Sequence, residues 1–310
     1  MIDLGTRLAR GEVIVLDGGS LRFPAYACGA ATVKPGLSWV PAFNPSAKAE
    51  RGMLSQVMSV QGAICREVRD VRLAMRSLVA YDPHDPWQVP MPFEGPALDR
   101  PIRVAFTKNT FEFDLHPAVE HALALARSAL ESAGYRVEEV EPPLLREAAA
   151  LGARCLMSDA LALTGPDVRK YGSATVNRIF DEYFRQFPPF EGVDYLKAMA
   201  DRSRFVRAWA VFLAEYPLVL TPFLPRPIFT WNRDEEGAEG VREVLGSAIY
   251  SYAMNFMGLP AGIAQAHLAD GQPVGVQIVG RRFREDLILD ACEAVEARVG
   301  VMAERLWAKV

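Results

Sequence analysis

The sequence of 310 residues lacks the features that mark several classes of protein. It has only four cysteines, Cys28, Cys65, Cys155 and Cys292, and no Cys-x-x-Cys pair. This spacing argues against a zinc cage and is typical of reduced thiols in a cytosolic protein. The net charge of −4 gives no basic excess, so neither nucleic acid nor an anionic membrane is expected as a partner. We therefore expect a cytoplasmic protein without a metal.

Long hydrophobic runs are also absent. The most apolar late segment, Trp209 to Leu224, is interrupted by a glutamate and two prolines, so no membrane span is expected. Residues 1–10 contain charged side chains and no apolar signal core. The sequence has no Gly-x-Gly-x-x-Gly, Walker loop, His-Glu-x-x-His or Gly-x-Ser-x-Gly motif. We expect no cofactor.

Half of the residues are hydrophobic, which is enough for a substantial core. Apolar patterning predicts strands at 13–16, 102–106, 135–140, 218–222, 263–266 and 274–279. It predicts helices at 68–80, 117–133, 144–163, 173–187, 193–216, 240–257 and 286–299. The run 102–140 has the order and length of a right-handed crossover between parallel strands. The pair Asp270-Gly271 predicts a hairpin turn.

One short stretch has the composition of a catalytic turn. The apolar run Val13 to Leu16 leads into Asp17-Gly18-Gly19-Ser20. Glycines allow successive backbone N–H groups to point at one position, as a developing oxyanion requires, and the serine would then be the attacking hydroxyl. The turn composition alone favours another interpretation, a strand-ending turn whose serine bonds to its own backbone.

The wider sequence resembles the amidase signature family of serine hydrolases. That family has an Asp-x-Gly-Gly-Ser-Ile-Arg-x-Pro-Ala motif followed by Cys-Gly and Leu-Lys-Pro-Thr. Here Asp17-Gly-Gly-Ser-Leu-Arg-Phe-Pro-Ala is followed by Cys28-Gly29 and Val33-Lys34-Pro35. A second match lies downstream, at 255–261 and 271–280. Two separated blocks in the family's order make the resemblance specific.

The resemblance implies an α/β amidase-signature fold, with a central mixed β-sheet flanked by helices. It implies one partial domain, 1–310, with an inserted helical or α+β lobe at 98–214 that sets the choice of substrate. The family's upstream lysine and its Gly-Gly-Ser-Ser-Gly-Gly loop have no counterpart, so we expect a shortened member with the N-terminal part of the sheet missing. An exposed sheet edge beside 13–16 would then favour a homo-oligomer.

The site residues follow from the resemblance, position by position. Ser20 matches the nucleophile, and Gly18, Gly19 and the backbone at Asp17 match the oxyanion turn. Arg22 matches the arginine that supports this turn, and our hypothesis is that it forms an ion pair with Asp17.

Two further residues are candidates for contact with a substrate. Thr221 resembles the strand end that faces the family's acyl pocket, and Gln277 lies mid-strand in an apolar run. The alternative for Gln277 is a hydrogen-bonded structural amide. The candidates for a substitute base are Lys34, Lys48 and His267, but most lysines are solvated, and a packing or surface histidine is the ordinary case.

The sequence thus predicts an amidase that hydrolyses a small linear carboxamide through a Ser20 acyl-enzyme. The first alternative is a truncated homologue that acts as a binding or regulatory subunit, or is a gene fragment. The second is a serine hydrolase with an unrecognised base. The distinction matters because a triad enzyme without its proton acceptor keeps only about 10³–10⁴-fold over water, whereas a working enzyme needs about 10⁶-fold or more.

Overall fold

An eight-stranded mixed sheet organises the part of the chain that the computed structural model describes, residues 14–15, 18–45 and 50–307. The strand order is β1-β3-β2-β7-β8-β6-β4-β5. The strands are β1 (Ile14–Val15), β2 (Ala31–Lys34), β3 (Ala63–Cys65), β4 (Arg103–Phe106), β5 (Arg136–Glu139), β6 (Leu218–Thr221), β7 (Ala261–Ala269) and β8 (Gln272–Gly280). β4 pairs in parallel with β5 and β6, and the other pairs are antiparallel. The prediction of a mixed sheet in an α/β fold is confirmed.

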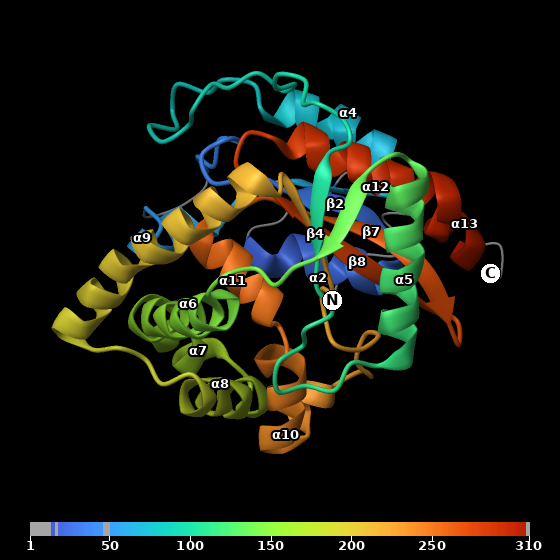
Figure 1. The fold of residues 1–310 in the computed structure, drawn as a ribbon. Helices are drawn as coiled ribbons and strands as arrows, with labels where there is room; N and C mark the ends of the chain where they lie inside the picture. Colours follow the sequence, from blue (N-terminus) through green and yellow to red (C-terminus); the bar gives the residue numbers. More distant parts are fainter. Residues whose placement is uncertain (1–13, 16–17, 46–49, 308–310) are drawn as a thin grey trace.

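Helices surround this sheet (Figure 1). They are α2 (Arg22–Cys28), α3 (Met53–Met58), α4 (Val68–Leu78), α5 (Pro117–Ser132), α6 (Leu145–Asp159), α7 (Gly165–Tyr171), α8 (Ala174–Gln186), α9 (Gly192–Glu215), α10 (Gly237–Val241), α11 (Ile249–Met257), α12 (Glu285–Val299) and α13 (Met302–Trp307). Short 3₁₀ turns occur at η1 (Gly18–Leu21) and η3 (Arg233–Glu235), and π-helical turns at η2 (Ala160–Thr164) and η4 (Arg242–Gly246). Among the described residues, no helix combines the length and apolarity that crossing a membrane requires.

Two hydrophobic cores lie on opposite faces of the sheet. Along β6, Leu218 and Leu220 belong to the first core and Val219 to the second, because successive strand residues point to opposite faces. Helices α4, α5 and α12 contribute to the first core, and α3, α6, α9 and α11 to the second. Figure 1 accordingly shows α6 and α11 gathered away from α5 and α12. The site described below lies where α2 meets α11.

The predicted crossover and hairpin are both present. β4 and β5 are neighbouring parallel strands, with Arg103 opposite Arg136, and α5 connects them. β7 and β8 pair along nearly their whole length, joined at Asp270 and Gly271, whose φ angles are 49° and 81°. Two successive positive φ values match the right-handed twist of a two-residue hairpin.

One predicted helix was wrong. The expected helix 240–257 is broken, because η4 and the residues at 247–248 separate α10 from α11. The segment 43–62 contains α3, which packs on α11. The nucleophile turn continues directly into α2. Pro24 is tolerated there because it lies in the first helical turn, where N–H groups need no intrahelical partner.

The expected inserted lobe, 98–214, contributes β4 and β5 to the same sheet as the rest of the chain. Its other helices, α6 to α9, follow β5 without adding a strand. A separate lobe with these boundaries stays a prediction.

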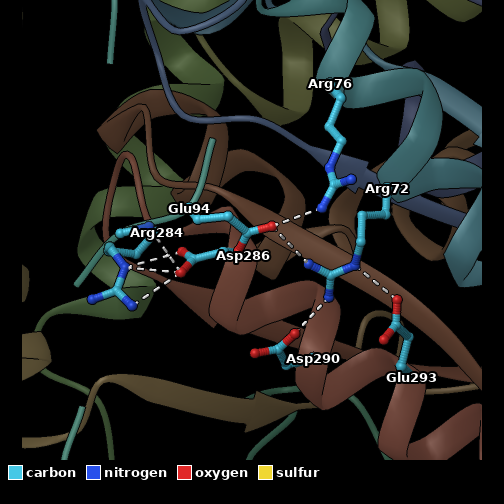
Figure 2. A network of polar contacts seen from close by, with 8 residues as sticks. Arg72, Arg76, Glu94, Arg284, Asp286, Asp290 and Glu293 are labelled. Carbon is cyan, nitrogen blue, oxygen red and sulfur yellow. Dashed lines mark hydrogen bonds and ion pairs between the residues drawn. The ribbon is translucent and has the colours of Figure 1, made fainter. Parts of the chain in front are cut away.

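An ion-pair network fixes α4 and the segment that follows it to α12 (Figure 2). Arg72 of α4 lies 2.5 Å from Asp290 and 2.9 Å from Glu293 of α12, and 3.8 Å from Glu94. Close to Glu94, the backbone N–H of Gly95 donates to the carboxylate of Asp286 at 3.2 Å. Exposed ion pairs contribute little singly, but a network around a half-buried arginine orients the elements that it joins.

Candidate active site

The Gly-Gly-Ser turn forms the start of a helical segment. Gly18 to Leu21 make the 3₁₀ turn η1, which runs directly into α2. Ser20 is exposed, whereas Leu21 is fully buried and anchors the turn in the first core. The first N–H groups of a helical segment have no acceptor within it and carry a partial positive charge. Asp17 lies outside the described residues, so its backbone and its predicted ion pair with Arg22 stay predictions.

Arg22 lies directly beneath the turn and is fully buried. Its Nη1 donates to Gln277 Oε1 at 2.6 Å, and its Nη2 donates to Asn255 Oδ1 at 2.7 Å. The same Nη2 donates to the carbonyl oxygen of Ser251 at 3.1 Å and to its Oγ at 3.2 Å. All four acceptors are uncharged, and burial lowers the pKa of Arg22 to about 9.

Gly19 rests directly on α11. A Cβ added at Gly19 would lie 3.0 Å from Ser251 Oγ and 3.1 Å from Asn255 Nδ2. A side chain there would have to push these two side chains aside by a few tenths of an ångström, so the close approach favours glycine as the second residue of the turn. The same two α11 residues therefore contact both the arginine and the turn.

Gln277 and Thr221 complete this buried network. Both are fully buried, and Gln277 Nε2 donates to Thr221 Oγ1 at 3.2 Å. Thr221 Oγ1 in turn donates to the carbonyl oxygen of Pro222 at 2.9 Å. With its oxygen bonded to Arg22, Gln277 uses both ends of its amide within the protein, as a structural amide does. Contact of either residue with a substrate stays a prediction.

Lys34 is buried, although most lysines are solvated. Its Nζ donates to the carbonyl oxygens of Pro35 and Leu259, each at 2.9 Å, and burial lowers its pKa well below the usual range. Glu285 lies in the same region, is fully buried, and accepts the N–H of Gly36 at 2.6 Å. Burial raises the pKa of Glu285 to about 7. These two groups hold the β2–Gly36 turn between α11 and α12.

The other candidate bases lie elsewhere. His267 of β7 packs edge-on against His121 of α5, with ring centroids 4.6 Å apart, and burial lowers its pKa. Lys48 is outside the described residues. In the described part of the chain, no hydrogen bond joins a lysine or histidine to Ser20.

Sequence reasoning missed Ser251 as a site residue and used Asn255 only as part of a motif. A signal was available, because the two are spaced i, i+4 and therefore share one face of a helix. In α11, where every residue is buried, such a polar pair indicates a buried polar partner.

The fold and the Gly-Gly-Ser turn above a buried arginine define the class of protein. The chain belongs to the amidase family, because the family model described as "Amidase" matches residues 17–289. The predicted membership of the amidase signature family is thereby confirmed.

Two curated relatives are similar to this chain over nearly its whole length. The indoleacetamide hydrolase of Bradyrhizobium diazoefficiens is 40% identical over 98% of this chain and 57% of its own. That of Bradyrhizobium japonicum is 39% identical over 98% of this chain and 65% of its own. The chain thus spans about three fifths of the length of these relatives.

Solved structures show the same fold. A 6-aminohexanoate cyclic dimer hydrolase superposes with a TM-score of 0.73 at 19% identity, covering 96% of this chain and 67% of that one. A bacterial aryl acylamidase of the amidase signature family gives a TM-score of 0.71 at 22% identity, with coverages of 98% and 65%. At these identities the likeness supports the fold alone.

Proposed function

We propose that this chain carries the nucleophile and oxyanion turn of an amide hydrolase. Ser20 Oγ attacks the carbonyl carbon of a carboxamide, and the backbone N–H groups at Gly18 to Ser20 receive the negative charge on the carbonyl oxygen. The C–N bond then breaks, and the nitrogen leaves carrying the proton that the Ser20 hydroxyl gives up. Water then cleaves the serine ester, which releases the carboxylic acid and restores the hydroxyl. The observation that supports this most is the exposed Ser20 on a turn braced by the buried Arg22 network.

For the substrate we propose an arylacetamide, a primary carboxamide whose carbonyl is joined through one carbon to an aromatic ring. Two curated relatives at 39–40% identity are named indoleacetamide hydrolases. Hydrolysis of such a substrate would release ammonia and an arylacetate. Thr221 and Gln277 would act here mainly through the network under the turn, since both are fully buried.

A second candidate function is supported by the surroundings of Ser20. In the described residues no lysine or histidine bonds to its hydroxyl. An oxyanion turn without a proton acceptor supports slow acylation and little turnover. The alternative is a binding or regulatory subunit that retains the amide site but does not hydrolyse its ligand.

The experiment that tests these proposals is labelling and turnover on the purified chain. We expect a fluorophosphonate probe to modify Ser20, ammonia to be released from indoleacetamide, and Ser20→Ala to abolish both. Ser132→Ala, which removes an exposed serine of α5, should change neither. Labelling of Ser20 without ammonia release would favour the binding subunit. No labelling at Ser20 would overturn the catalytic proposal.

A further inference from the structure

We propose that Ser251 and Asn255 of α11 are positioning residues for the nucleophile turn, acting through Arg22 on one side and Gly19 on the other. This inference rests on the proposed function only in taking Ser20 as the nucleophile. It assigns to α11 a role that goes beyond packing in the second core.

The first argument is the geometry at Arg22. This residue is the second after Ser20, and its buried guanidinium donates to four acceptors on two elements. The Nη···O distances are 2.6 Å to Gln277, 2.7 Å to Asn255, and 3.1 and 3.2 Å to the carbonyl oxygen and Oγ of Ser251. A guanidinium is planar with its donors in a fixed fork. The acceptors on β8 and α11 therefore fix the direction of the Arg22 side chain, and with it the start of α2.

The second argument is the contact at Gly19. Ser251 Oγ and Asn255 Nδ2 stand 3.0 and 3.1 Å from the position of a Cβ on this residue. The same two side chains therefore accept from Arg22 and pack against the turn at Gly19. Without Asn255, the turn would lose both a charge-assisted hydrogen bond through Arg22 and its direct support.

The consequence for reaction is positional. A nucleophile and an oxyanion site work only when both are held in place, and displacement by about 1 Å can lower the rate about 10²-fold. Ser20 is exposed and has no burial of its own to fix it, so the turn depends on the residues beneath it.

The matched control lies at the other end of α2. Gln265 is buried, and its Nε2 donates to the carbonyl oxygens of Ala25 and Ala30, each at 2.9 Å. Asn255→Leu and Gln265→Leu therefore both remove a buried amide that braces α2. Only the first reaches the nucleophile turn.

The experiment compares these variants in the full chain by two measurements. One is the second-order rate of fluorophosphonate labelling at Ser20. The other is the backbone hydrogen exchange of a peptide covering residues 18–22, which does not require activity. We expect Asn255→Leu to label about 10²-fold more slowly and to lose exchange protection at 18–22. Gln265→Leu should change neither measurement by more than about twofold at equal folded fraction.

Two further variants grade the effect. Ser251→Ala removes the Oγ, which accepts from Arg22 at 3.2 Å and packs at Gly19, but keeps the carbonyl acceptor, so a labelling loss of a few fold is expected. Asn255→Asp keeps an acceptor for Arg22 and should restore exchange protection at 18–22.

The outcomes separate this inference from the proposed function. If the unchanged chain does not label, the catalytic proposal fails, and exchange at 18–22 still tests the link between α11 and the turn. Equal exchange and equal labelling in Asn255→Leu and Gln265→Leu would overturn the positioning role. So would an Asn255→Leu chain with unchanged protection at 18–22.

Discussion

At the scale of single residues, Lys34 and Glu285 are unusual because both are fully buried on either side of one turn. No ion pair within 4 Å joins them, and each bonds to backbone groups instead. Burial disfavours the charged form of both, so the pKa of Lys34 is lowered and that of Glu285 is raised. The turn is thereby sensitive to pH.

Glu285 gives the first prediction at this scale. Its pKa rises from 4.5 in the unfolded chain to about 7 in the folded one, so folding favours the protonated form. The resulting stability is fully present below about pH 4.5 and is lost as the pH rises through 7. The loss is on the order of 3 kcal/mol for a shift of this size.

Urea unfolding of the original chain and of Glu285→Gln between pH 4.5 and 8 measures this effect. Glutamine keeps an oxygen for the N–H of Gly36 and does not titrate. We expect the free energy of unfolding to fall less steeply with pH in the variant. Burial also raises the pKa of Glu296 to about 7, but that residue is present in both proteins. Identical slopes would contradict the prediction.

The residues of the site show what a sequence can and cannot reveal. Ser20, Gly18, Gly19 and Arg22 lie in one short motif, so the local sequence was sufficient to identify them as candidate site residues. The acceptors of Arg22 lie 229 to 255 positions away, and no local pattern connects them to it. The burial of Lys34 was not predicted, because it depends on residues more than 220 positions away, Leu259, which accepts its Nζ, and the buried Glu285.

At the scale of elements, turn chemistry was more informative than apolar periodicity. Asp270-Gly271 was located correctly, because only a few residue pairs accept two positive φ angles. The helix expected at 240–257 was wrong because apolar residues continue through the break at 247–248. Periodicity cannot distinguish one helix from two that share a buried face.

The hairpin gives the second prediction. Gly271 has a φ of 81°, and no heavy atom lies within 4 Å of a Cβ added to it. Gly271→Ala would therefore cost backbone strain alone, and we expect it to lower the free energy of unfolding by about 1 kcal/mol.

The control is Gly246→Ala, in the helical turn η4. An added Cβ there meets its nearest atoms at an ordinary 3.5 Å, and alanine favours helical backbone. Thermal unfolding should show this variant equal to or above the original chain and Gly271→Ala below it. A Gly271→Ala chain as stable as the Gly246→Ala chain would contradict the prediction.

At the scale of the whole molecule, the two ends of the sheet differ. β5 carries Arg136, Glu138 and Glu139, of which Arg136 and Glu138 form an ion pair at 3.1 Å. Charged side chains on an edge strand discourage pairing with another chain. β1 occupies the other end of the described strand order and is paired only with β3 there. Self-association through the sheet is therefore expected at β1 and not at β5.

The last prediction follows from this asymmetry. We expect sedimentation equilibrium to show a mass that rises with concentration, and Ile14→Lys to lower it towards the monomer, because a charge on an edge strand opposes pairing. Leu73→Lys adds the same charge at an exposed position of α4 and should leave the mass of the original chain unchanged. If both lysine variants behaved alike, net charge and not the edge of β1 would control association. An original chain that stays monomeric at every concentration would show that this edge is closed.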